Sequence, residues 1–122
     1  MPILLALSGV TAILTAGGHS WLGERHILRP LSSGTAEVGV LRKPVNRRLL
    51  RAVWHLPSVI WAVLGAATVA LAASGRFDAR FLIVFGAIYA ASAACNFFAV
   101  RGPHVGQALL LATVGLMALS FV

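Results

Sequence analysis

Four apolar runs divide the chain, and each has a length that could cross a lipid bilayer as a helix. A transmembrane helix needs about 20 predominantly apolar residues. The runs cover about residues 3–22, 52–73, 79–100 and 104–122, and a polar segment over 23–51 separates the first two. Short turns separate the last three runs, which favours antiparallel packing of neighbours. The pattern predicts a single all-α integral membrane domain over residues 1–122, with four antiparallel transmembrane helices in a bundle.

The composition supports a bilayer as the solvent of this chain. Hydrophobic residues make up 59% of the sequence and charged residues 11%, whereas a soluble domain is about half apolar and about a quarter charged. The mean hydropathy is +0.90. A soluble core of this size could not bury so many apolar side chains, so we expect them to face lipid.

Positive charge is concentrated in the segment 23–51, which holds seven of the ten Lys and Arg residues. Loops rich in Lys and Arg stay on the cytoplasmic side of a membrane. We therefore expect a bacterial inner-membrane protein with this basic loop in the cytoplasm and both termini on the opposite side. Topology explains the net charge of +7 without a nucleic-acid partner. Arg47, Arg48 and Arg51, at the start of the second helix, are predicted to contact lipid headgroups.

Three histidines fall at the same ends of three different predicted helices. They are His19, His55 and His104, and all would lie at the cytoplasmic end of the bundle. Neutral imidazole is a common ligand of transition metals, and such sites use three or four ligands. The spacing therefore predicts a transition-metal site at these residues. Haem clamped between His19 and His55 is an alternative, since paired histidines serve as its axial ligands.

Further polar residues share helix faces with these histidines. Residues three or four apart in a helix lie on one face, and polar groups are costly in contact with lipid. We therefore expect a polar pocket at the cytoplasmic end whose ligand-binding residues include Ser58, Ser92, Asn96 and Gln107. The alternative is that these side chains only form hydrogen bonds between helices.

The sequence leaves three functions open. The first is a membrane protein whose histidine-lined pocket binds a metal ion, haem or another small ligand. The second is an accessory or assembly subunit of a larger membrane complex, or a homo-oligomer, without chemistry of its own. Small residues spaced by four, at Gly86, Ala90 and Ala94, would allow such close helix contacts. The third is a small transporter. No catalytic motif points to an enzyme.

Overall fold

The computed structural model describes residues 2–33, 39–75 and 78–122, and this part of the chain is helical without strands. A continuous helix comprises α1 (Pro2–Gly23), a π-helical turn (Glu24–Leu28) and α2 (Arg29–Ser33). A short 3-10 helix (Gly39–Arg42) precedes α3 (Pro44–Ser74), and α4 (Ala79–Val100) and α5 (Val105–Leu119) follow. The predicted all-α class is confirmed.

Three helices are long and apolar enough to cross a membrane. They are Pro2–Ser33, Pro44–Ser74 and Ala79–Val100. Helix α5 is apolar but has 15 residues, about 22 Å at 1.5 Å per residue, less than the ~30 Å of a hydrocarbon core. Apolar side chains also cover the outer surface, with Leu14 and Val63 each more than half exposed. These features are consistent with residence in a bilayer.

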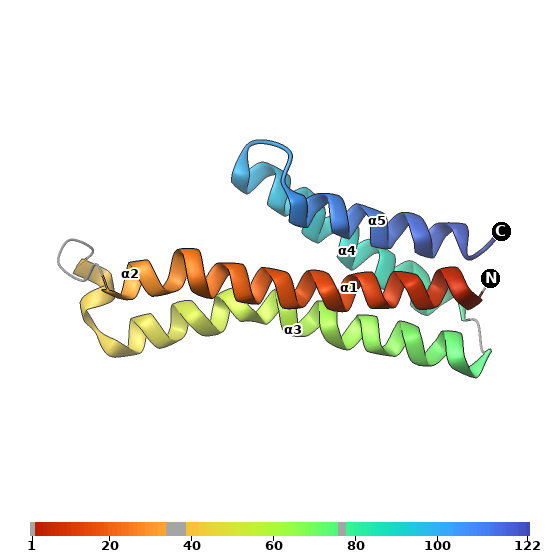
Figure 1. Ribbon diagram of the computed structural model, residues 1–122, viewed down its shortest axis with the longest axis horizontal. Helices are drawn as coiled ribbons and strands as arrows, with labels where there is room; N and C mark the ends of the chain where they lie inside the picture. Colours follow the sequence, from red (N-terminus) through yellow and green to blue (C-terminus); the bar gives the residue numbers. More distant parts are fainter. Residues whose placement is uncertain (1, 34–38, 76–77) are drawn as a thin grey trace.

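The helices form two antiparallel pairs, α1 with α3 and α4 with α5 (Figure 1). Helix α1 packs against both α3 and α5, whereas α3 and α4 scarcely contact each other. The pairs lie together near the start of α1 and the end of α5 and diverge toward the other end. The short connection between α3 and α4 suggested that they would pack as neighbours in one bundle. That four-helix bundle is not confirmed.

The α1–α3 hairpin is longer than the sequence pattern suggested. Much of the segment 23–51, predicted as a basic loop, is helical, because the first helix continues through α2 to Ser33 and α3 begins at Pro44. Pro30 does not stop the first helix, since the π-helical turn directly before it changes the register of the backbone hydrogen bonds. Because α3 begins at Pro44, Pro57 lies in the interior of the helix.

Two glycines set the close approach of α1 and α3. A Cβ atom on Gly9 would lie 2.5 Å from the carbonyl oxygen of Gly65, and one on Gly65 would lie 2.7 Å from the carbonyl oxygen of Gly9. The two backbones therefore touch at this point. Contacts of this kind are the usual basis of helix association within membranes.

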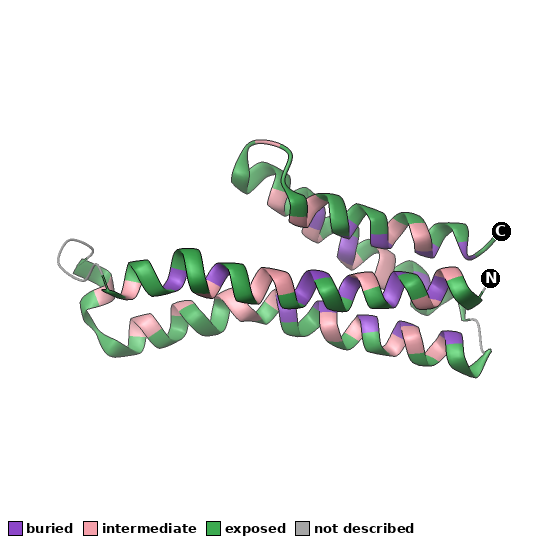
Figure 2. Cartoon of the chain, viewed as in Figure 1, coloured by how far each residue is buried: buried purple, intermediate pink, exposed green. Residues whose placement is uncertain are grey.

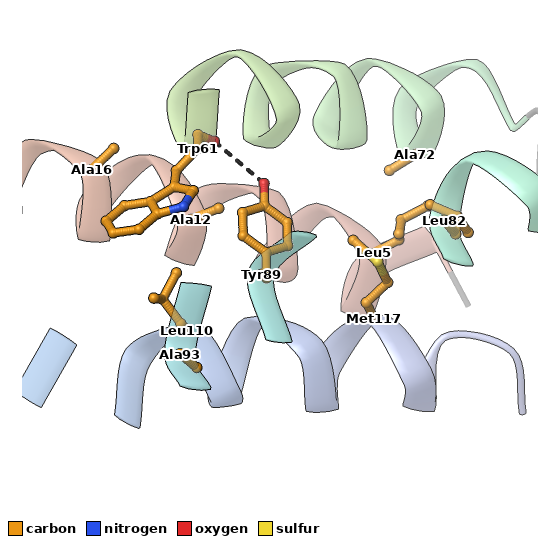
Figure 3. Packing of buried hydrophobic residues seen from close by; sticks show 10 residues of the cluster. All are labelled: Leu5, Ala12, Ala16, Trp61, Ala72, Leu82, Tyr89, Ala93, Leu110 and Met117. Atoms are coloured by element: carbon orange, nitrogen blue, oxygen red, sulfur yellow. Dashed lines mark hydrogen bonds between the residues drawn. The ribbon is translucent and has the colours of Figure 1, made fainter. Parts of the chain in front are cut away.

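The buried core lies where the two helix pairs come together, whereas the far end of the α1–α3 hairpin is mostly exposed (Figure 2). Tyr89 of α4 is at its centre, and its hydroxyl donates to the carbonyl oxygen of Trp61 at 3.3 Å (Figure 3). The Trp61 indole N–H donates to the hydroxyl of Ser92 at 3.1 Å. Trp61 thereby links α3 to α4 by side chains where the two helices otherwise make little contact.

The Ser8 hydroxyl joins α1 to α5, and its removal is expected to weaken the fold slightly. It is fully buried and donates to the carbonyl oxygen of Thr113 at 2.9 Å. Ser8→Ala should lower the free energy of unfolding by about 0.6 kcal/mol, the average for interhelical hydrogen bonds in membranes. The matched control is Thr11→Ala, because Thr11 donates within its own helix to Leu7. Equal stability of the two variants in detergent unfolding would contradict the assignment.

Candidate functional site

A pocket of about 420 Å³ lies between α1, the π-helical turn, α3 and the connection of α4 to α5. It occupies the region where the two helix pairs diverge. Apolar side chains form much of the wall, including Leu14, Leu22, Ile27, Val100 and Leu109. The pocket is therefore a mainly apolar space near the basic end of the molecule.

The polar part of the wall comes from α1, the π-helical turn, α3 and α4, and from His104, which caps α5. His19 belongs to α1, His26 to the π-helical turn and Asn96 to α4, while His104 precedes α5. Trp54 and Trp61 of α3 complete this part. No Asp, Glu, Lys or Arg is among the lining residues that the structure describes. The arrangement offers hydrogen bonds but no fixed charge.

His19 is held in one orientation by three neighbours on α3. Its Nδ1 lies 2.9 Å from the hydroxyl oxygen of Ser58. Its ring stacks on Trp54 with centroids 5.1 Å apart and an interplanar angle of 9°, and Trp61 meets it edge-on at 5.2 Å. These contacts give the pocket a rigid aromatic wall.

Trp54 lies directly against the backbone of α1 at Gly23. Any side chain at position 23 would collide with the indole, so glycine is required there. The indole Nε1 is buried and has no hydrogen-bond partner among the described residues. Buried donors are nearly always paired. The Trp54 N–H is therefore a buried donor that packs against Gly23 and has no partner in the described part of the chain.

The hydrogen bonds of the two remaining pocket histidines define the free nitrogen of each ring. His104 is the N-cap of α5, and its Nδ1 accepts from the backbone N–H of Gly106 at 3.1 Å. A neutral ring with an accepting Nδ1 carries its proton on Nε2, which is then a donor. His26 Nδ1 donates to the carbonyl oxygen of Leu22 at 3.2 Å, which leaves its Nε2 as an acceptor when the ring is neutral.

The predicted metal site at His19, His55 and His104 is not supported by the part of the chain that the structure describes. The described residues contain no group of three His, Cys, Asp or Glu side chains placed to hold a metal ion. His55 does not line the pocket; its Nδ1 lies 2.9 Å from the Ser20 hydroxyl oxygen. Each of the three rings instead has its Nδ1 in a hydrogen bond. The expected haem pair, His19 and His55, is likewise engaged with serines across the α1–α3 interface and is not supported.

The four residues predicted to bind a ligand have different positions. Asn96 lines the pocket. The Ser58 hydroxyl is hydrogen-bonded to His19 Nδ1. Ser92 accepts from the Trp61 indole and donates to the carbonyl oxygen of Ile88 in its own helix. Gln107 directly follows the lining residue Gly106, and its Oε1 is buried without a partner in the described part of the chain.

A second polar cluster beside the pocket was not predicted. Ser20 is bonded to His55, and the His55 Nε2 lies 3.6 Å from a carboxylate oxygen of Glu24. The order Ser–His–Glu resembles a nucleophilic triad. However, Ser20 lies inside α1, where backbone N–H groups bond within the helix and cannot stabilise an oxyanion. We assign the cluster to holding α1 and α3 together.

The arginines predicted to contact lipid headgroups lie on the first turns of α3. Arg51 forms an ion pair of 3.1 Å with Glu24, and Arg47 donates to the carbonyl oxygen of Leu41 at 3.2 Å. Arg48 is exposed. Contact with headgroups stays a prediction for these residues.

Comparisons with protein-family models, with curated proteins and with solved structures found no match to this chain.

Proposed function

We propose that this is an integral membrane protein that binds a lipid-soluble small molecule in the pocket between α1, α3 and the α4–α5 connection. The observation that carries the proposal is the convergence of His19, Asn96 and His104, from three parts of the chain, on one mainly apolar pocket. Ligand sites are typically apolar cavities of about 300–1,000 Å³ with a few placed polar groups. A small molecule suits the pocket better than a metal ion, because the described residues include no three His, Cys, Asp or Glu side chains close enough together to hold a metal.

The π-helical turn adds independent support. Such turns are rare and often lie at functional sites. Here the turn, Glu24–Leu28, brings His26 and Ile27 into the pocket wall. The π-helical turn thus contributes residues to the pocket wall and also accommodates Pro30 in the helix.

We place the pocket near the cytoplasmic face of a bacterial inner membrane. The basic residues at the far end of the α1–α3 hairpin would lie in the cytoplasm, and both termini on the opposite side, by the positive-inside rule. The pocket then lies at the depth where the apolar spans meet the headgroups, and a ligand would enter it from the bilayer. The described residues provide no specific observation in favour of an accessory subunit or a transporter.

Filling the pocket should abolish binding, and two adjacent glycines provide the test. Gly18 lines the pocket and Gly17 does not, and a Cβ atom on either would meet no other atom within 4 Å. Gly18→Leu should therefore place a large side chain in the pocket without disturbing the fold. The matched control, Gly17→Leu, has the same chemistry on the outer face.

The readout is photolabelling of the protein in lipid nanodiscs by a neutral diazirine alkyl probe, mapped by mass spectrometry. We expect saturable labelling of pocket residues in the wild type and in Gly17→Leu. Gly18→Leu should weaken it at least about 10-fold, since a loss of 1.4 kcal/mol already has this effect. Labelling that does not saturate, or equal labelling of the two variants, would refute the proposed function.

A further inference from the structure

The aromatic wall of the pocket favours a flat ligand. His19 and Trp54 stack nearly parallel, Trp61 meets them edge-on, and all three line the pocket. Aromatic faces bind other planar rings by offset stacking. An alkyl chain alone would gain little from this rigid surface.

The absence of charge in the described wall excludes most lipids with ionic heads. A buried carboxylate or phosphate needs a compensating charge, and the lining residues provide imidazole, amide and indole groups instead. The ring that fits this wall is therefore uncharged.

Two polar residues of the wall can donate to a ligand that accepts hydrogen bonds. His104 carries a donor at Nε2 when its ring is neutral, and Asn96 has an amide donor; both residues line the pocket. Carbonyl oxygens on a planar ring would satisfy such donors without introducing charge.

The remaining wall suits an apolar tail. Leu14, Ile27, Val100 and Val105 line the pocket and are also partly exposed on the outer surface, which would face lipid. A chain attached to the ring could thus leave the pocket and continue into the bilayer. From these features together we infer that the ligand is a quinone, a flat uncharged ring with carbonyl oxygens and an isoprenoid tail. The inference rests on the proposed function.

Tryptophan fluorescence provides a direct test, because bound quinones quench nearby indoles. The chain has three tryptophans, and the exposed Trp21 lies outside the pocket. The protein with Trp21→Phe, in nanodiscs of phosphatidylcholine, would be titrated with menadione and with a short-tailed ubiquinone. We expect saturable quenching that Gly18→Leu weakens about 10-fold and that Gly17→Leu leaves unchanged. Decanol, which lacks the ring, should compete more weakly than either quinone.

His104→Asn tests the hydrogen bond to the ring. Asparagine is a good N-cap, so α5 should remain capped, but its shorter side chain removes the imidazole donor. We expect quinone affinity to fall 5- to 10-fold while labelling by the alkyl probe stays at the wild-type level. Saturable labelling of the pocket without quenching or competition by either quinone would overturn the quinone assignment and leave the proposed function intact. Failure of every probe to bind would overturn both.

Discussion

Gly9→Leu is expected to lower the free energy of unfolding by about 3 kcal/mol, the largest stability loss that we predict for a single substitution. The reason is the contact of two backbones: a Cβ at position 9 would lie 2.5 Å from the Gly65 carbonyl oxygen and 2.8 Å from a methyl group of Val69. The oxygen cannot rotate away, so α1 and α3 must separate. Overpacking of this kind costs about 1–3 kcal/mol, and a backbone obstacle places it at the upper end.

Gly65→Leu should have the same effect from the opposite helix, since its Cβ would meet the Gly9 carbonyl oxygen at 2.7 Å. The control is again Gly17→Leu, which gains the same helix propensity in open space. Reversible unfolding in mixed detergent micelles, followed by circular dichroism, gives the three free energies. If Gly9→Leu were as stable as Gly17→Leu, the close α1–α3 contact would be refuted.

The sequence predicts the apolar helices well, because a long apolar run in a bilayer forms a helix that satisfies its own backbone hydrogen bonds. The third run, predicted over 79–100, agrees with α4 at Ala79–Val100. The polar segment 23–51, predicted as a basic loop, contains more helix than expected. Arginines are compatible with helix. The segment is helical where the two helices of the α1–α3 hairpin extend beyond the apolar runs.

Pair formation is the part of the fold that chain order could not give. Short connections suggested that consecutive helices would pack together, so that α3 would lie beside α4. Instead, α1 packs against α5, and α3 and α4 make few contacts. The backbone contact at Gly9 and Gly65 and the Ser8 hydrogen bond to Thr113 determine this arrangement. Glycine and serine occur throughout the chain, so neither residue type alone could identify its partner.

Three of the residues predicted for the site, His19, Asn96 and His104, line one pocket, because all three lie near the same end of their helices. His55 does not line it. Helical spacing gives the face on which His55 lies but not the neighbour of that face, which is Ser20. Trp54 was not among the residues predicted for the pocket. The one sequence signal for its role is Gly23, where α1 leaves room for the indole.

Glu24 is the acid on which the basic end of the hairpin depends. Its carboxylate lies 3.1 Å from Arg51, 3.6 Å from Arg29 and 3.6 Å from the His55 Nε2. The Glu24 side chain is 26% exposed, so solvent weakens these pairs only in part. Without the carboxylate, the guanidinium groups of Arg29 and Arg51 would repel each other. Glu24→Gln should therefore lower the free energy of unfolding by about 1–2 kcal/mol, between the values for exposed and buried charged hydrogen bonds.

A double-mutant cycle isolates this interaction from general effects of the substitution. If Glu24 acts through Arg51, the double variant Glu24→Gln with Arg51→Gln should be less destabilised than the sum of the single variants by about 1 kcal/mol. Thermal unfolding in a neutral detergent provides the measurement, since an anionic one would itself bind the arginines. The loss in Glu24→Gln should also shrink at high salt, because Arg51 is 45% exposed and its pair is partly screened. Additive effects that do not change with salt would show that Glu24 does not hold the two helices together by charge.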